Sequence, residues 1–264
     1  MAAKYERITG DLRRKIRSGD LAPGEQLPSQ SALAESYDVS LPTVQQALGI
    51  LQAEGLLDVI QGLGTYVRLP KHRVRRTTDR YRWEKARAHL PDEERGREGA
   101  AEHDTGLIFE DFEFFASYDT GPVTDDLAQV FGVEPGTRML HRVYRTRLRG
   151  DAGWLNVIDS YLVYEVAAAN PALLDAANEP WPGGTHHQLL TIGLEIDKIT
   201  DEITARPPQG DEPELLGIGP GVSVLVLRKI SIDIRGQVVE VSDVVMPADR
   251  TVVVYETQLE RWQT

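Results

Sequence analysis

The apolar residues at the start of the chain recur at helical spacing. They are Tyr5, Ile8, Leu12 and Ile16. Their separation by three or four positions predicts an amphipathic helix that ends near Ser18-Gly19. A turn rich in proline and glycine follows at residues 20–24. Ser29 is a suitable N-cap for a second, shorter helix that runs to Tyr37, because its hydroxyl can accept a bond from a free backbone N–H.

A third helix is predicted between Ser40 and Gly55. Ser40 is a suitable N-cap, Pro42 is tolerated in the first turn, and Gly55 ends the helix. The apolar stripe of this helix consists of Val44, Ala47, Leu48 and Leu51. Two short strands, residues 56–60 and 65–69, then flank a turn at residues 61–64. Three helices followed by a β-hairpin are typical of a winged helix-turn-helix, whose third helix enters the major groove of DNA.

From about residue 107 the pattern changes to alternating apolar and polar positions, which predicts strands. The candidate strands are residues 107–117, 137–149, 154–164, 195–205, 222–234 and 237–246, and the candidate helices are residues 124–131, 164–177, 186–192 and 212–217. Arg235-Gly236 would join the last two strands in a hairpin. The predicted fold class is therefore α+β: an N-terminal winged helix-turn-helix at residues 1–69, and a C-terminal antiparallel sheet with helices at residues 105–264.

The distribution of charge assigns contact with nucleic acid to the N-terminal part. The formal net charge is −12, yet residues 71–87 carry eight basic and two acidic side chains. Residues 88–264 carry 14 basic and 31 acidic side chains, and the phosphates of DNA would repel them. Residues 70–104 are interpreted as a basic linker that leads into the second domain. This linker either contacts phosphate or is a solvated charged tether.

Several stretches of the chain resemble a known family. Ile16–Ser29, Leu33–Glu35, Val44–Leu56 and Gln61–Val67 resemble the DNA-binding domain of GntR-family regulators. Residues 100–260, including Arg145, Arg147 and the segment Asp159-Ser160-Tyr161, resemble the UTRA effector domain of the HutC subfamily. The resemblance implies a chorismate-lyase-like sheet and a homodimer formed largely through this domain. It also implies double-stranded operator DNA and a small-molecule effector as partners. The predicted function is a ligand-responsive transcriptional repressor.

Four positions depart from the family pattern. Family members usually carry an arginine that contacts DNA where this chain has Ser31, Leu41, Gln45 and Leu63. Arginine reads guanine through two hydrogen bonds, whereas glutamine prefers adenine. We therefore expect an operator different from the common one, with Thr43, Gln45 and Gln46 as the main readers. The alternative is a dimer whose DNA binding is weakened.

The predicted DNA contacts combine these positions with the neighbouring cap, wing and basic residues. Lys4 and Arg7 are candidates for phosphate contacts, together with the cluster from Arg13 to Arg17. The other candidates are Ser29, Ser31, Ser40, Leu41, Pro42, Thr43, Gln45, Gln46, Gln61, Gly62, Gly64 and Thr65. Each phosphate contact adds about −0.9 to the slope of log affinity against log salt concentration, so a salt titration would count them.

Arg145 and Arg147 are the main candidates for the effector site. They are two residues apart on a predicted strand, so they point to one face, together with Met139 and Val143. Buried guanidinium groups need an anionic partner, which a phosphate or carboxylate of the effector can supply. An ion pair with an acidic residue, or exposure to solvent, is the alternative. The resemblance adds Asp159, Thr185, His187 and Glu240, and the alternative for Glu240 is a surface position on a strand.

No cofactor, metal site or catalytic residue is predicted. The chain has no cysteine, and the adjacent His186 and His187 would point apart on a helix. A lyase-like enzyme is the weaker alternative, because nucleophile, P-loop and cofactor motifs are missing and a fold does not carry chemistry. The sequence shows neither an apolar run of about eighteen residues nor a signal peptide, so we expect no membrane contact and a cytoplasmic location.

Overall fold

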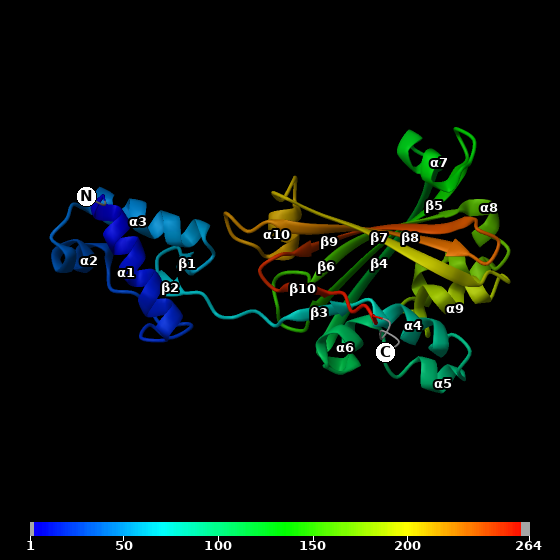
Figure 1. The fold of residues 1–264 in the computed structure, drawn as a ribbon, viewed down its shortest axis with the longest axis horizontal. Helices are drawn as coiled ribbons and strands as arrows, with labels where there is room; N and C mark the ends of the chain where they lie inside the picture. Colours follow the sequence, from blue (N-terminus) through cyan, green and yellow to red (C-terminus); the bar gives the residue numbers. More distant parts are fainter. Residues whose placement is uncertain (1–2, 260–264) are drawn as a thin grey trace, which may run out of the picture. The chain divides into compact units, whose positions relative to one another are not determined.

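The computed structural model describes residues 3–259. The chain divides into two compact units, which Figure 1 draws in one view. The N-terminal unit comprises residues 1–72 and 207–223, and the C-terminal unit comprises residues 73–206 and 224–264. None of the described helices is long and apolar enough to cross a membrane.

The N-terminal unit confirms the predicted winged helix-turn-helix. Its elements are α1 (Lys4–Ser18), α2 (Gln30–Tyr37), α3 (Leu41–Ala53), β1 (Leu57–Ile60) and β2 (Gly64–Val67). The Ser29 side chain accepts a bond from the backbone N–H of Ala32 and so caps α2, as predicted. The α10 helix (Glu212–Leu216) lies in the segment that this unit includes. Strands β1 and β2 pair in antiparallel fashion to form the wing.

The apolar stripes of the three helices meet in one core. Ile8 and Leu12 of α1 pack with Leu33 of α2 and with the predicted stripe of α3, and Leu57 and Val67 of the wing complete the cluster. Ile8, Val44, Leu51 and Leu57 are completely buried. Burial of these side chains is the main favourable contribution to folding of a module this small. The opposite face of α3 takes no part in this core and is available for other contacts.

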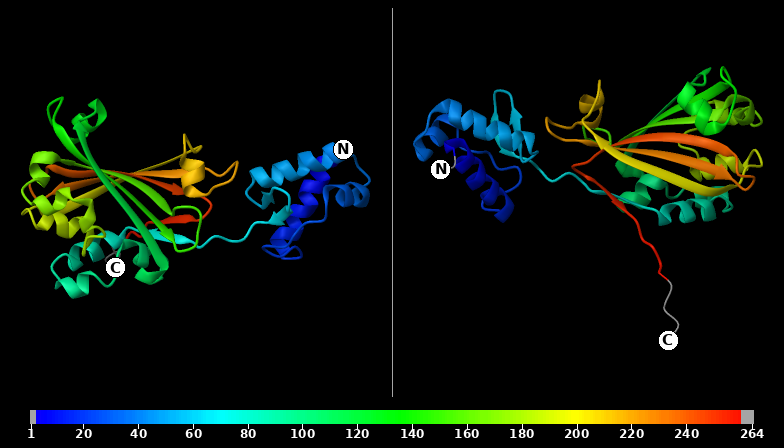
Figure 2. Two further views of the ribbon diagram at one scale, coloured as in Figure 1. Left: turned by 180° about the vertical axis from the view of Figure 1, so that it is seen from behind. Right: turned by 45° about the horizontal axis from the view of Figure 1, so that its top comes forward.

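The C-terminal unit is built on a six-stranded antiparallel sheet with the order β4-β5-β6-β9-β8-β7. The strands are β4 (Phe112–Pro122), β5 (Arg138–Leu148), β6 (Asn156–Val163), β7 (Ile196–Arg206), β8 (Val224–Asp233) and β9 (Val238–Pro247). The β8–β9 hairpin turns at Gly236, whose positive φ of 80° favours glycine, as the Arg235-Gly236 pair predicts. Figure 2 shows this sheet from two further directions.

Helices cover both faces of the sheet. On one face, α7 (Asp125–Phe131) packs Leu127 and Phe131 against Met139 of β5 and Val241 of β9. On the other face, α8 (Tyr164–Ala167) and α9 (Gly184–Leu190) pack against residues of β5 and β6 that include Leu140 and Leu162. Successive residues of β5 therefore face opposite layers, so the parity of a residue number decides which layer its side chain meets.

Residues 73–105 differ from the prediction of a linker. They form β3 (Val74–Thr77), α4 (Asp79–Arg87), α5 (Asp92–Arg95) and α6 (Ala100–Thr105). Strand β3 pairs in parallel with β10 (Thr251–Val254), near the far end of the sequence. Arg76, Arg80 and Arg87 are buried. These three arginines are therefore neither a solvated tether nor a phosphate-binding patch, and burial of their charges is costly wherever no partner meets them.

Two predicted elements have other bounds in the structure. The helix expected at residues 164–177 ends at Ala167 and is followed by the 3-10 turns η2 (Pro171–Leu174) and η3 (Ala176–Asn178). Asn170 and Asp175 accept bonds from the backbone two residues later, which competes with helical bonding. The strand expected at residues 107–117 begins only at Phe112, after the 3-10 turn η1 (Phe109–Asp111).

Candidate nucleic-acid interface and ligand cavity

The first turn of α3 presents an exposed face beside the buried stripe of that helix. Leu41, Pro42, Gln45 and Gln46 are exposed, while Val44, Ala47 and Leu48 are buried in the core. The exposed set lies at the N-terminal end of the third helix, which in a helix-turn-helix is the part that reaches base edges. Of the predicted readers, Gln45 and Gln46 are therefore available for contact with DNA, while Thr43 is half-buried.

Hydrogen bonds fix the orientation of two polar groups on this face. The Gln45 amide nitrogen donates to the side-chain oxygen of Gln30 on α2 at 3.2 Å. Ser40 caps α3 by position, but its hydroxyl lies 2.9 Å from the hydroxyl of Thr43 and forms no side-chain bond to the backbone. The bond between Gln30 and Gln45 holds the carboxamide of Gln45 at the surface of the two helices. A carboxamide held in this way can donate one hydrogen bond to adenine and accept another from it.

The wing is fixed by bonds to its turn. Gln26 and the hydroxyl of Tyr66 both donate to the backbone oxygen of Leu63, at 2.8 and 3.3 Å. The tip itself, with Gln61, Gly62 and Leu63, is exposed. Thr65 is buried. The structure thus presents the tip of the wing at the surface, while the predicted contact residue Thr65 lies in the interior.

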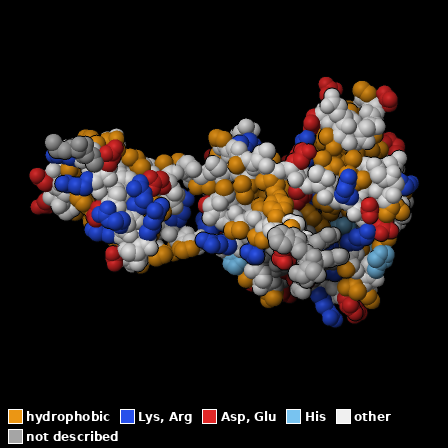
Figure 3. Space-filling view, viewed as in Figure 1, with side chains coloured by type: hydrophobic (Ala, Val, Ile, Leu, Met, Phe, Trp, Pro, Cys, Tyr) orange, Lys and Arg blue, Asp and Glu red, His pale blue; other side chains and the backbone are white. Residues whose placement is uncertain are grey.

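The basic residues of α1 are partly engaged in contacts within the protein. Arg13 pairs with Glu54 at 2.5 Å, and Arg14 and Lys15 both pair with Asp11 at 3.0 Å. Arg7 donates to the backbone oxygen of Tyr37. Lys4, Arg7, Arg14, Lys15 and Arg17 are exposed, and Figure 3 shows basic side chains gathered over α1. Surface ion pairs are weak, so these side chains can exchange their partners for phosphates at little cost.

A cavity of about 350 Å³ lies in the C-terminal unit, between the sheet and the helices of residues 79–105 and 184–190. Its floor consists of side chains from neighbouring strands of the sheet, among them Phe114, Tyr144, Ile158 and Met246. Its walls include Arg80, Glu84 and Arg87 of α4, Glu102 and Asp104 of α6, Trp181, and Thr185 and Gln188 near α9. An apolar floor with a few convergent polar groups is typical of a small-molecule site.

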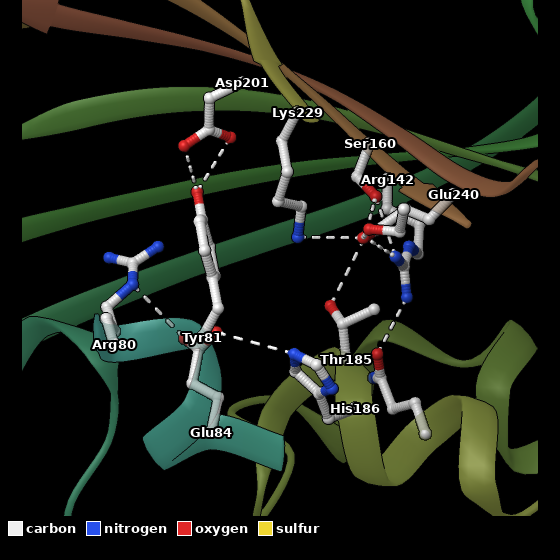
Figure 4. A network of polar contacts seen from close by, with 12 residues as sticks. Arg80, Tyr81, Glu84, Arg142, Ser160, Thr185, His186, Asp201, Lys229 and Glu240 are labelled. Carbon is white, nitrogen blue, oxygen red and sulfur yellow. Dashed lines mark hydrogen bonds and ion pairs between the residues drawn. The ribbon is translucent and has the colours of Figure 1, made fainter. Parts of the chain in front are cut away.

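A buried polar cluster lies beside this cavity, and Figure 4 draws the side chains that form it. Glu240 is at its centre and accepts bonds from Arg142, Ser160 and Lys229 at 2.8, 2.8 and 2.9 Å. Thr185 of α9 also donates to Glu240, at 3.3 Å. Arg142 donates to Gln188 of α9 at 2.8 Å. The cluster therefore ties α9, one wall of the cavity, to four strands of the sheet, β5, β6, β8 and β9.

The ionisation of Glu240 follows from this arrangement. Complete burial alone would raise the pKa of its carboxyl group, but the cationic Lys229 and Arg142 outweigh burial and lower the pKa to about 2. Arg142 is also completely buried. The Glu240 carboxylate is thus charged at neutral pH and compensates cations that would otherwise be isolated inside the protein.

A second set of polar contacts joins Tyr81 and Glu84 of α4 to the rest of the C-terminal unit. Tyr81 donates to both carboxylate oxygens of Asp201 at 2.8 and 2.9 Å, and burial raises the pKa of Tyr81 to about 12. Glu84 lies 3.8 Å from His186 of α9. Burial lowers the pKa of His186, although Glu84 opposes this effect. These contacts connect α4 to α9 and to β7, so the segment that the sequence presents as a linker forms a wall of the cavity.

The structure separates the six predicted effector residues. Arg145 and Thr185 border the cavity, and Glu240 lies in the buried cluster beside it. The other three are engaged elsewhere. Arg147 pairs with Glu113 at 2.6 Å, Asp159 bonds to His141 at 2.8 Å, and His187 accepts a bond from the Trp181 indole at 2.8 Å. For Arg147 the structure therefore supports the alternative of an ion pair with an acidic residue.

Strand parity accounts for the position of Arg147, whereas Arg145 has the same parity and still borders the cavity. Arg145 and Arg147 share the face of Met139, which meets α7, whereas the floor residue Tyr144 shares the face of Arg142. The Arg145 guanidinium lies 5.1 Å from the centre of the Phe115 ring, its cross-strand neighbour. Sequence reasoning missed Arg142, although it lies in a strand that also contains buried apolar residues. The alternation of side chains along β5 does not by itself say whether the odd-numbered or the even-numbered residues face a cavity.

Comparison with known proteins connects both features to one family. Residues 4–67 match the model of bacterial regulatory proteins of the gntR family, and residues 115–251 match the UTRA domain. This chain belongs to the GntR family. As a GntR-family protein with a UTRA domain, it is a ligand-responsive DNA-binding transcriptional regulator and not an enzyme, so the lyase-like alternative has no support.

Similar proteins span nearly the whole chain. A HTH-type transcriptional regulator of Streptomyces coelicolor is 27% identical over 90% of this chain and 87% of its own length. The HTH-type transcriptional repressor NagR of Bacillus subtilis is 26% identical over 93% of this chain and 91% of its own length. A crystal structure of a GntR-family transcriptional regulator is 28% identical, covers 98% of both chains and has a TM-score of 0.64. Both domains of this regulator are therefore found together in its relatives.

Proposed function

We propose that this GntR-family regulator represses transcription from an operator bound through α3, and that a small molecule in the cavity of the C-terminal unit releases it. The exposed first turn of α3, with Gln45 held by Gln30, supports the operator contact. The cavity walled by α4, α6 and α9 supports the effector contact. The similar protein NagR is named a repressor, which supports repression as the direction of control.

We further propose that the regulator acts as a homodimer, with contacts between copies made largely by the C-terminal unit. A helix-turn-helix dimer reads two half-sites that are related by two-fold symmetry. The expected operator is therefore a palindrome with two copies of one short sequence. Sedimentation of the full chain, with and without a fragment that carries both half-sites, tests this stoichiometry.

The first test is binding to the DNA upstream of the regulator's own coding sequence. We expect tight, localised binding at about 100 mM salt, with an affinity that falls steeply as salt rises because phosphate contacts release counterions. Anisotropy titration and footprinting measure the affinity and locate the site. Binding that is weak and indifferent to sequence would instead support the second candidate function, a dimer whose DNA binding is weakened by Ser31, Leu41, Gln45 and Leu63.

Gln45→Arg tests the role of Gln45 in base recognition. Arginine prefers guanine where glutamine prefers adenine, so the variant should change the preferred base at one position of each half-site by about 1–3 kcal/mol. Selection from a randomised operator library, followed by titration of the two preferred sites, measures the change. Glu35→Gln, an exposed position on α2, serves as the control and should leave the preferred sequence unchanged. An unchanged base preference in Gln45→Arg would exclude Gln45 as a reader.

Release by effector is measured on the same operator fragment. A coupling free energy of about 1–3 kcal/mol, typical of allosteric proteins, would lower operator affinity by roughly 5- to 150-fold. A low-molecular-mass extract of the cells that produce the regulator is titrated into the bound complex, and anisotropy reports the dissociation. A complex that resists every fraction, while still binding its operator tightly, would contradict control by a small molecule.

A further inference from the structure

Arg87 is a buried cation in the wall of the cavity, and it has no acidic partner within the part of the chain that the structure describes. Its side chain donates to the backbone oxygen of Arg95, and its guanidinium lies 4.2 Å from the centre of the Trp83 ring. No carboxylate of the described residues forms an ion pair with it. Burial lowers the pKa of Arg87, and the more distant acids, with Glu98 the strongest, offset only part of this effect.

Three other buried arginines near the cavity have acidic partners, and a fourth, Arg76, donates to the Tyr81 hydroxyl at 2.9 Å. Arg80 pairs with Asp104 at 2.6 Å, and Arg142 pairs with Glu240 at 2.8 Å. Burial alone would lower the pKa of each guanidinium, but Glu84 and Asp104 raise the pKa of Arg80. Tyr144 and then Glu240 raise the pKa of Arg142. Arg95 pairs with Asp92. Arg87 shares with Arg76 the lack of an ion pair among the described residues, but the Tyr81 hydroxyl that Arg76 binds is itself bonded to Asp201. Arg87 contacts only a backbone oxygen and an aromatic ring. A carboxylate or phosphate group can supply the anion for Arg87 through paired hydrogen bonds.

Two buried oxygens of α6 in the same cavity lack hydrogen-bond donors. One carboxylate oxygen of Glu102 caps the backbone of Gly99 at 2.8 Å, while its second oxygen has no partner. One oxygen of Asp104 bonds to Arg80, and the other has no partner. Glu102 is 2% exposed and Asp104 is 6% exposed. Because unsatisfied buried acceptors cost free energy, a ligand that brings a donor gains from binding here.

The floor of the cavity and part of its wall form an apolar and aromatic surface. Phe109, Phe114 and Trp181 line it together with Ile158 and Met246. Phe109 and Phe114 stack with their ring centres 5.4 Å apart. An aromatic or aliphatic body fits such a surface, because its burial removes apolar area from water on both sides.

We propose that the effector is a small organic acid with an apolar body and an amino or hydroxyl group, with its acid group on Arg87 and its donor on Glu102 and Asp104. This inference rests on the proposed effector role of the cavity and names the chemical class of the effector. It also moves the anion-binding residue from Arg145 and Arg147 on β5 to Arg87 on α4. The segment that holds the acid is then the one that follows the DNA-binding domain in sequence.

The test uses four probes with the same phenyl body and measures their binding to the full chain by calorimetry. L-Phenylalanine and phenyllactate carry both an acid and a donor, 3-phenylpropionate carries only the acid, and phenethylamine carries only the donor. We expect L-phenylalanine or phenyllactate to bind at least about tenfold more tightly than 3-phenylpropionate or phenethylamine, since each missing charged bond costs about that factor. The better of the two then identifies the donor as ammonium or hydroxyl.

Variants then identify the residues that bind the acid. Arg87→Gln should weaken the acid probes at least about tenfold, and Arg87→Lys, which keeps the charge, should weaken them less. Arg147→Gln, on the opposite face of the sheet, is the matched control and should bind like the wild type. Thermal unfolding of each variant confirms that it is folded.

Two outcomes would overturn the inference. One is that no acid probe binds; the other is that Arg145→Gln loses binding of the acid probes while Arg87→Gln binds them like the wild type. Either outcome leaves the proposed function standing as long as the wild-type regulator binds its operator and a cell extract releases it. Failure of the proposed function would instead be seen in the wild type, as absence of operator binding or of release.

Discussion

Replacement of Glu240 by alanine is expected to lower the free energy of unfolding of the C-terminal unit by about 3–5 kcal/mol. The carboxylate accepts bonds from Arg142 and Lys229 at 2.8 and 2.9 Å. Without it, the completely buried Arg142 would keep its charge with no acidic partner. Urea unfolding of the full chain, followed by tryptophan fluorescence, measures the loss, because Trp83, Trp154 and Trp181 all lie in the C-terminal unit.

The dependence of this effect on pH separates charge from shape. The pKa of Glu240 in the folded protein, about 2, lies below the ordinary value of 4.5. Its contribution to stability is therefore present above about pH 5 and disappears as pH falls toward 2, by about 3 kcal/mol in total. Glu240→Gln keeps the shape but not the charge, so its difference from the wild type should shrink over this range. A difference that is constant between pH 5 and 2 would contradict the assigned pKa.

Replacement of Leu51 by alanine is expected to destabilise the N-terminal unit by about 2–5 kcal/mol, because it leaves a cavity in a small core. Leu51 is completely buried between the helices of that unit. A module of this size has little stability in reserve, so we expect the variant to lose most of its operator affinity while the C-terminal unit still unfolds at its usual temperature. Anisotropy titration and calorimetry measure the two effects separately.

Leu69→Ala is the matched control, because it removes the same atoms from a side chain that is 63% exposed. Its effect on stability should stay within about 0.5 kcal/mol. Operator binding that is equally strong in Leu51→Ala and Leu69→Ala would show that the core of the N-terminal unit tolerates the cavity. A lower unfolding temperature of the C-terminal unit in Leu51→Ala would show that the two units unfold together.

The sequence by itself determined the DNA-binding domain almost completely. Helix spacing, the Ser29 cap and the glycines of the wing are local, and each acts within about a dozen residues of chain. The observed helices begin and end close to the predicted bounds for that reason. Exposure of Gln45 could also be predicted, because a residue beside a buried stripe such as Val44 and Ala47 must lie on another face of the helix.

The ligand cavity was decided by tertiary structure. Strand alternation grouped Arg145 with Arg147 correctly, but alternation does not say which face of a sheet the helices will enclose. That choice depends on packing of α9 against one face and of α7 against the other, which are contacts between distant parts of the chain. Arg142 has an even number, so its side chain faces the opposite side of the sheet from Arg145 and Arg147. It is the arginine that is buried with Glu240.

The basic segment at residues 71–87 illustrates the same limit. Its composition is typical of an exposed linker, because isolated arginines are costly to bury. In the structure Arg80 meets Asp104 of α6, Tyr81 meets Asp201 of β7, and β3 pairs with β10. Local sequence shows how many charges a segment carries. Whether those charges are solvated or paired depends on partners that only the folded chain brings within a few ångströms.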